Sequence, residues 1–246
     1  MHYIAKRIIK GNGQGRLRMQ YEPLTPGPPR LDEPAPYFEG RSTQGSIKLT
    51  DFSGKWLVFF AHPADFTPVC TSEFVTFAKR SAEFAALNCR LLGLSVDSVY
   101  SHLAWRESIR ERFGVTIEFP ILEDSSLQIA QRFGMLQSHH TANAVTRALF
   151  VIDPQGAVRA MLQYPVNVGR SVGEVLRLLE ALQTADRLRV VTPEGWMPGA
   201  DAIEPPPETA RAADERRGSK GDLGVGCVDW YYYKRRGRDE RTSANR

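Results

Sequence analysis

Apolar and polar positions follow two different periods along the middle of the chain. Residues 46–50 alternate at every second position and 56–61 are apolar throughout, which is typical of half-buried and fully buried strands. Residues 101–113 have apolar positions three or four apart, which predicts an amphipathic helix. In chain order the pattern predicts strands at 46–50, 56–61, 90–96, 119–122, 147–152 and 158–164, and helices at about 68–87, 101–113, 126–133 and 172–185.

Strands that alternate with helices and are followed by a hairpin and a last helix predict an α/β sandwich. The turn Asp153-Pro154-Gln155-Gly156 separates the last two strands and is a strong hairpin signal. Because crossover helices join parallel strands and a hairpin joins antiparallel ones, we expect a mixed central sheet.

The two ends of the chain lack these periods. Residues 1–30 are rich in Gly, Pro and Arg, and we expect a flexible basic extension there. From Thr192 onward the composition changes to Pro, Gly and charge, and the prolines exclude long regular elements. We therefore divide the chain into the extension 1–30, a core domain 31–187 and a small irregular C-terminal arm 188–246.

The C-terminal arm is nevertheless too apolar for a free tail. A segment with aromatic anchors and little core of its own is best explained by packing on another surface. That surface is either a partner subunit or the chain's own sheet. The apolar residues concerned are Trp196, Cys227, Trp230, Tyr231, Tyr232 and Tyr233.

The length of 246 residues allows a substantial core, and 42% of the residues are hydrophobic. No apolar run approaches the ~20 residues that a membrane-spanning helix needs. Residues 1–13 contain charges but no apolar stretch of the kind found in secretory signals. We therefore expect a cytoplasmic protein that does not use a membrane.

The net charge of +4 is concentrated at the two ends. Residues 1–30 contain six Lys or Arg and one Glu, and residues 234–246 contain six Lys or Arg and two acids. Residues 31–233 are left with a net charge of −5. Basic clusters can bind nucleic acids. Because no zinc-finger or RNP pattern accompanies these clusters, we interpret them as solvated tails and expect no nucleic-acid partner.

The three cysteines, Cys70, Cys89 and Cys227, are too few and too scattered for a secreted disulfide framework. Cys89 precedes a buried strand and is interpreted as a core residue. No His/Cys pair has zinc-ligand spacing, and the adjacent His139 and His140 are interpreted as a polar loop. We expect neither a metal nor another cofactor.

The most informative stretch is residues 63–70, Pro-Ala-Asp-Phe-Thr-Pro-Val-Cys, directly after the apolar strand. Thr67 suits a helix N-cap and Pro68 the first helical position, so Cys70 falls at the third. Free backbone N–H groups and the helix dipole favour a thiolate over a thiol there. The ordinary alternative is a small apolar residue in a core helix.

Residues 60–74 resemble the active-site segment of peroxiredoxins, in particular the 1-Cys, peroxiredoxin-6-like subfamily and its archaeal thioredoxin-peroxidase relatives. Pro63, Thr67 and Cys70 meet the family's Pro-x-x-x-Thr-x-x-Cys pattern. The resemblance implies a thioredoxin-like fold and a thiol-dependent peroxidase that reduces hydrogen peroxide and organic hydroperoxides. Further matches lie at 94–98, 119–121, 164–170, 205–207 and 227–230, so the resemblance covers roughly residues 30–233.

The resemblance also implies roles for four residues. Cys70 would be the peroxidatic nucleophile and would form a sulfenic acid. Arg147, at the start of a predicted strand, matches the active-site arginine and would stabilise the thiolate and the peroxide oxygens. Thr67 would bridge the sulfur and the peroxide, and Pro63 would shield the sulfur from water.

Three further residues are supporting candidates. Glu73 lies one turn after Cys70 and either orients Arg147 by a charge-assisted pair or is only a helix-start charge. Arg170 matches a second arginine near the family's site. His62 matches the histidine of a Ser-His-Pro pattern, and it either hydrogen-bonds the oxidised sulfur or is simply packed in the core.

The thiol that reduces the sulfenic acid is left open by the sequence. Archaeal-type relatives have two cysteines six residues apart in the arm, and the second is the usual resolving residue. Here Cys227 occupies the first position and Tyr233 the second. Either Cys227 resolves, from a partner subunit, or the enzyme is 1-Cys and uses an external thiol, thioredoxin-like or small. The resemblance also implies homodimers joined into a ring, often a decamer.

Two other functions remain possible for the same residues. A thiol–disulfide oxidoreductase is disfavoured because Cys70 begins Cys-Thr-Ser-Glu and the CxxC motif is missing. A non-enzymatic redox sensor or holdase would use Cys70 without turnover. An insulin-reduction assay would identify the oxidoreductase. Steady-state consumption of peroxide with a reductant would exclude the sensor or holdase.

Overall fold

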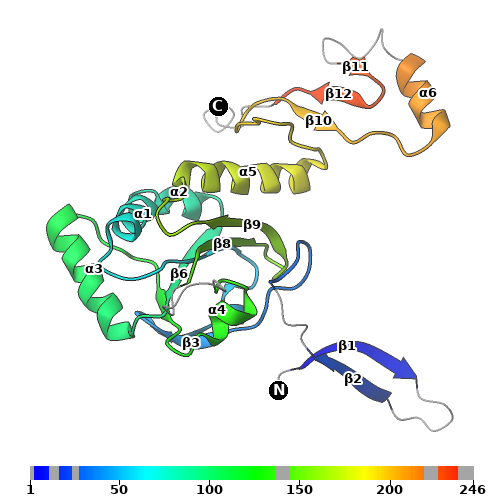
Figure 1. Ribbon diagram of the computed structural model, residues 1–246. Coiled ribbons are helices and arrows are strands. Elements are labelled where there is room, and N and C mark those ends of the chain that lie inside the picture. The colour runs from blue at the N-terminus through cyan, green and yellow to red at the C-terminus, as the bar shows by residue number, and fades with distance from the viewer. Residues whose placement is uncertain (1–2, 11–16, 24–27, 137–144, 219–226, 238–246) are drawn as a thin grey trace.

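A mixed sheet of seven strands forms the centre of the molecule (Figure 1). The structure is a computed structural model, and it describes residues 3–10, 17–23, 28–136, 145–218 and 227–237. The strand order is β4-β3-β7-β6-β5-β8-β9, with β5, β6 and β7 parallel and β8 and β9 antiparallel to their neighbours. The strands are β3 Glu39–Ser42, β4 Gly45–Lys48, β5 Trp56–Ala61, β6 Cys89–Ser95, β7 Ile121–Glu123, β8 Arg147–Ile152 and β9 Val158–Tyr164.

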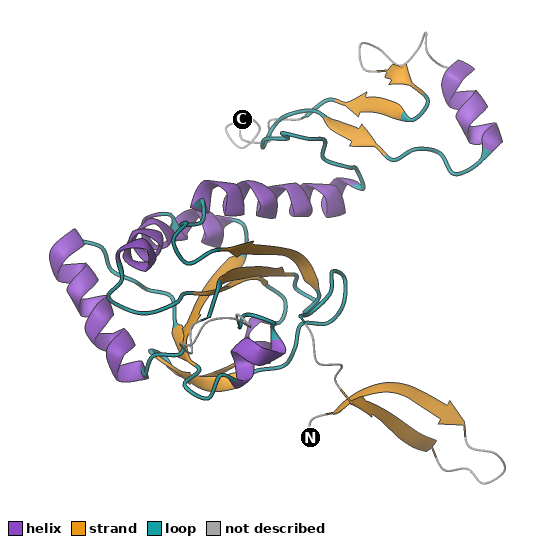
Figure 2. Ribbon diagram, in the orientation of Figure 1, coloured by secondary structure: helices purple, strands orange, loops and turns teal. Residues whose placement is uncertain are grey.

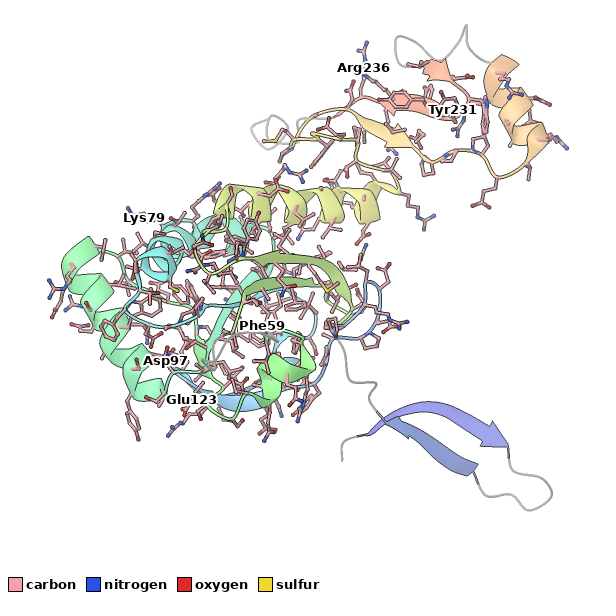
Figure 3. All side chains as sticks on the ribbon, in the orientation of Figure 1. Phe59, Lys79, Asp97, Glu123, Tyr231 and Arg236 are labelled. Atoms are coloured by element: carbon pink, nitrogen blue, oxygen red, sulfur yellow. The ribbon has the colours of Figure 1, made fainter. Side chains whose placement is uncertain are left out.

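Helices cover both faces of this sheet (Figure 2). Side chains of α1, α2, α3 and α5 pack on one face, and those of α4 pack on the other. Strand β5 is apolar throughout because both of its faces are buried. Val58 and Phe60 point into the core beneath α1, α2, α3 and α5, and Leu57 and Phe59 (labelled in Figure 3) point into the core beneath α4. The helices are α1 Pro68–Lys79, α2 Ser81–Ala86, α3 Val99–Phe113, α4 Gln128–Arg132 and α5 Val172–Leu188, with a 3-10 turn at Leu49–Phe52.

Local signals define both ends of α3. The Ser98 hydroxyl accepts a hydrogen bond from the Ser101 N–H at the start of α3, and Gly114 ends that helix with a φ of 64°. The single helix predicted at 68–87 is wrong, because the chain leaves helical geometry at Arg80 (φ −104°, ψ 10°) and continues as α2. No glycine or proline precedes this break, so the sequence pattern carries no signal for it.

The N-terminal extension is more regular than expected. Strands β1 Tyr3–Lys10 and β2 Leu17–Pro23 pair antiparallel in a sheet of their own. The sequence pattern predicts no strands for these residues. Their Tyr and Ile content favours strands, although the surrounding Gly and Pro obscure the pattern.

The C-terminal arm contains short elements between its prolines. Strands β10 Ala202–Glu204, β11 Cys227–Asp229 and β12 Tyr232–Arg235 form a sheet of order β10-β12-β11, and α6 spans Ala210–Gly218. No helix in the described part of the chain is long and apolar enough to cross a membrane.

The aromatic residues of the arm differ in exposure. Trp196 is buried within its own chain, and its indole N–H donates to the Ala200 carbonyl at 3.1 Å. Tyr231, labelled in Figure 3, is 54% exposed and Val228 is 66% exposed. The arm therefore uses part of its apolar surface on its own chain and leaves another part uncovered.

Gly93 of β6 provides a test of core packing. A Cβ atom at this position would lie 3.0 Å from Cζ of Phe74 on α1. We expect Gly93→Ala to lower the free energy of unfolding by about 1–3 kcal/mol, because the buried ring has to shift. Urea denaturation measures the change. Gly218→Ala is the control, since a Cβ there meets no described atom within 4 Å, and equal effects of the two substitutions would contradict this packing.

Candidate active site

Cys70 lies where strand β5 passes into helix α1. Thr67 is extended (φ −102°, ψ 148°) immediately before the helix, Pro68 is the first helical residue and Cys70 is the third, as the sequence predicts. The Cys70 side chain has no exposed surface. The free N–H groups and the dipole of the first turn therefore act on a sulfur that is screened from water.

Thr67 occupies the predicted N-cap position, but its side chain makes no capping hydrogen bond to the helix. Its hydroxyl instead donates to the Ala64 carbonyl at 2.9 Å, within the loop of residues 62–67. Because the hydroxyl proton is used in this bond, its lone pairs remain available as acceptors. In the same loop, Phe66 has a φ of 56°, which bulky residues rarely adopt.

Arg147 reaches the sulfur from the neighbouring strand. Strands β5 and β8 are antiparallel, with Phe60 opposite Leu149, so the start of β8 lies beside the end of β5. The Nη1 atom of Arg147 lies 3.3 Å from Sγ of Cys70. Its Nε and Nη2 atoms donate to the Val166 carbonyl at 2.8 and 2.6 Å, which fixes the guanidinium plane. The structure thus brings together two of the predicted site residues, 77 positions apart.

The Glu73 carboxylate joins Arg147 to Arg170. Glu73 Oε2 accepts from Arg147 Nη1 at 2.9 Å and from Arg170 Nη2 at 2.8 Å, and Oε1 accepts from Arg170 Nε at 2.8 Å. All three side chains are almost fully buried. Burial alone would raise the pKa of Glu73, but the hydrogen bonds and charge of Arg170, with the charge of Arg147, lower it. Two cations thus share one anion, and the surplus positive charge lies next to Cys70.

A second buried network contains His62. The Asp65 carboxylate bridges His62 Nε2 and His102 Nδ1, each at 2.8 Å, and His102 comes from α3. Burial lowers the pKa of His62. Burial alone would raise the pKa of Asp65, but the hydrogen bonds from the two imidazoles lower it. The possible metal-ligand atoms of these three residues lie within 4.8 Å of one another. Among the residues that the structure describes, this group could hold a metal ion by its geometry.

Comparison with known proteins identifies the family. Residues 31–161 match the AhpC/TSA family, and residues 181–220 match the C-terminal domain of 1-Cys peroxiredoxin. A peroxiredoxin of Aquifex aeolicus is 48% identical over 219 residues, which cover 85% of this chain and 97% of the relative. The chain belongs to the peroxiredoxin family. A peroxiredoxin of Methanosarcina mazei is 43% identical over 210 residues, which cover 82% and 95% of the two chains.

Solved structures support the same assignment. A yeast mitochondrial 1-Cys peroxiredoxin is 37% identical, with a TM-score of 0.73 and coverage of 84% of this chain and 99% of the other. A cysteine-to-serine mutant of peroxiredoxin 6 of Arenicola marina is 29% identical, with a TM-score of 0.74 and coverage of 85% and 99%. This peroxiredoxin is therefore a thiol-dependent peroxidase with a thioredoxin-like fold, and the resemblance to the 1-Cys, peroxiredoxin-6-like subfamily is confirmed.

The other two cysteines of this peroxiredoxin lie in different environments. Cys89 is buried in β6, and burial raises the pKa of its thiol to about 12, so it stays protonated. Cys227 begins β11, opposite Tyr233 of β12, in the C-terminal sheet beyond α5 (Figure 1). The side chain of Cys227 lies outside the described part of the structure, as do His139 and His140.

Sequence reasoning missed Asp65 and His102. The spacing of His62 and Asp65, three residues apart in one loop, was a usable signal for their contact. His102 is one of several polar residues in an amphipathic helix, and only the packing of α3 brings it to the loop. Pro63 is half-buried in this loop.

The buried carboxylate provides a test of the charge network. We expect Glu73→Gln to destabilise the protein by about 3–5 kcal/mol, because two buried guanidinium groups lose their anion. Folding lowers the pKa of Glu73. Its ionised carboxylate therefore makes its full contribution to the free energy of unfolding above the ordinary carboxyl pKa of about 4.3, and this contribution is lost as the pH falls through the pKa of the folded state. Acidification should therefore destabilise the wild type more than the variant.

The control for this test is Glu83→Gln. Glu83 pairs with Arg80 on the surface of α2, where ion pairs contribute about 0–1 kcal/mol. Denaturant unfolding between neutral and acid pH measures both variants. A Glu73→Gln protein as stable as Glu83→Gln at neutral pH would show that the buried network adds nothing.

Proposed function

We propose that Cys70 is the peroxidatic nucleophile and that its substrates are hydrogen peroxide and small organic hydroperoxides. The observation that carries this proposal is the 3.3 Å contact between Arg147 Nη1 and Cys70 Sγ at the start of α1. The thiolate attacks one peroxide oxygen and a sulfur–oxygen bond forms. The oxygen–oxygen bond breaks, and the second oxygen leaves with the electron pair as hydroxide or alkoxide. Cys70 becomes a sulfenic acid.

Arg147 acts on the charged species of this step. An ionic hydrogen bond from a guanidinium favours the thiolate over the thiol. As the oxygen–oxygen bond lengthens, negative charge moves from sulfur to the leaving oxygen, and the same cation stabilises it. Glu73 and Arg170 support this role because they fix Arg147 without neutralising it, since the two arginines share one carboxylate.

Thr67 and Pro63 contribute from the loop of residues 62–67. The Thr67 hydroxyl already donates to Ala64, so we assign it as the acceptor for the O–H of a hydroperoxide. Pro63 has no N–H and keeps a competing donor away from the sulfur.

His62 is a further supporting residue in this proposal. Its Nδ1 has no hydrogen-bond partner among the described residues. It can accept the proton of the sulfenic acid in a hydrogen bond once Cys70 is oxidised.

The second half of the reaction requires a thiol. The thiol sulfur attacks the Cys70 sulfenic acid, a disulfide forms and water leaves. Because Cys70 has no exposed surface, the first turn of α1 has to open before another protein thiol reaches it. Either Cys227 of a partner subunit or an external thiol supplies the sulfur. The yeast relative was described with glutathione and thioredoxin systems, which supports a thioredoxin-like or small-thiol reductant here.

Self-assembly completes the proposal. We place the protein in the cytoplasm as a homodimer, assembled into a higher ring such as a decamer. The exposed Val228 and Tyr231 of the arm support contact with a second subunit, because exposed apolar patches mark protein–protein interaction sites.

Cys70→Ser is the decisive variant for the nucleophile. We expect it to abolish peroxide consumption with a thiol reductant, because a serine hydroxyl is not ionised at neutral pH. Cys89→Ser is the matched control and should retain activity, since the Cys89 thiol is buried and protonated. A coupled assay and intact mass after one equivalent of peroxide measure the two. Full activity of Cys70→Ser would refute the assignment.

The resolving thiol is tested by non-reducing electrophoresis after peroxide treatment. If Cys227 resolves, the wild type forms a disulfide-linked dimer and Cys227→Ser accumulates Cys70 sulfenic acid without that dimer. A dimer band that persists in Cys227→Ser would exclude Cys227. Absence of the band in the wild type, with full activity on an external thiol, would assign the 1-Cys alternative.

A further inference from the structure

The loop of residues 62–67 is held by side chains from two other segments. The Asp65 N–H donates to the carboxylate of Asp97 at 2.8 Å. Asp97 follows the end of β6 and is labelled in Figure 3. The Asp65 carboxylate accepts from His102 of α3 at 2.8 Å. Phe66, the next residue, has the unfavourable φ of 56°, which persists only where neighbouring contacts enforce it. Asp65 is therefore the anchor that keeps the loop in its shape.

The hydrogen bonds of Asp65 fix where the two imidazoles carry their protons. An ionised carboxylate only accepts, so His62 carries its proton on Nε2 and His102 carries its proton on Nδ1. His62 Nδ1 and His102 Nε2 are buried and have no partner among the described residues. A proton on either atom would be an unsatisfied buried donor. Each imidazole is thus held in one tautomer.

The same reasoning argues against a metal ion at this group. Ligation through His62 Nε2 and His102 Nδ1 would require both atoms to be unprotonated. The protons would then move to His62 Nδ1 and His102 Nε2, which have no described acceptor. Ligating histidines usually donate their other N–H to an acceptor, and that second contact is missing among the described residues. Hydrogen bonding satisfies the group better than a metal ion does.

We propose that Asp65 and His102 are positioning residues for peroxide reduction: they hold the loop that carries Pro63 and Thr67, and they keep His62 protonated on Nε2 only. This role rests on the proposed function of Cys70. It links α3 to the active-site loop through one carboxylate. Trp105 strengthens the link, because its ring stacks on His62 at 5.1 Å and its N–H donates to the Thr71 hydroxyl of α1 at 3.3 Å.

A pair of His102 variants tests this role. His102→Leu removes the donor to Asp65, and we expect the rate of Cys70 oxidation to fall by about ten- to a hundred-fold, as for other small misplacements of an active site. His102→Asn places an amide donor near the position of Nδ1 and should retain most of the wild-type rate. Stopped-flow tryptophan fluorescence or competition for peroxide measures these rates in the full-length protein.

Ile109→Ala is the matched control for general destabilisation. Ile109 lies on α3 like His102, is buried, and belongs to the core beneath α1, α2, α3 and α5. We expect this variant to lower the melting temperature and to leave the oxidation rate unchanged. A folded His102→Leu protein that oxidises at the wild-type rate would overturn the positioning role, as would an equal loss of rate in Ile109→Ala.

Nitrogen-15 NMR of the imidazoles tests the tautomers without any peroxide. The wild type at neutral pH should show His62 protonated at Nε2 only and His102 at Nδ1 only. The opposite tautomer, or two protons on either ring, would refute the proposal. Stoichiometric zinc binding that is lost in His102→Leu would also refute it. If the wild type does not reduce peroxide, the proposed function fails, whereas this NMR experiment still tests the hydrogen-bonded arrangement.

Discussion

The candidate active site depends on one buried carboxylate between two guanidinium groups. Burying three charges is costly unless every donor and acceptor is paired, and here the remaining donors of both arginines reach backbone carbonyls. Arg170 Nη1 donates to the Ala148 carbonyl at 2.8 Å, and Arg147 donates to the Val166 carbonyl. The arrangement retains one surplus positive charge beside the Cys70 sulfur.

Four segments supply this arrangement, and the sheet determines how they meet. Strand β5 leads into the loop of residues 62–67, α1 carries Cys70 and Glu73, β8 begins with Arg147, and the loop after β9 carries Arg170. Because β8 pairs antiparallel with both β5 and β9, the end of β5, the start of β8 and the end of β9 lie at the same end of the sheet. Gly169, next to Arg170, packs closely on α1, because a Cβ there would lie 3.3 Å from the Val69 side chain.

The burial of the sulfur separates the two halves of the proposed reaction. Because Cys70 has no exposed surface, the residues that cover it have to move for either reactant, and a protein thiol requires a larger movement than a small peroxide does. Asp65 and His102 hold the loop that precedes this helix start. In the proposed reaction, the same contacts that order the site for the peroxide step would also oppose the opening that the thiol step requires.

The sequence predicted six of the seven strands of the central sheet, the hairpin and the position of Cys70 at a helix start, because hydrophobic period, turn residues and capping preferences are local properties. It missed β3 and the strands of the two ends of the chain. It also pointed to Arg147, Glu73 and Arg170 through the resemblance to a family, although nothing local brings them together. The Thr67 side-chain bond, the break at Arg80 and the His102 contact were decided by tertiary structure. In each case the sequence offers several chemically similar hydrogen-bond partners or packing surfaces. Which of them is used depends on how distant segments fold against one another.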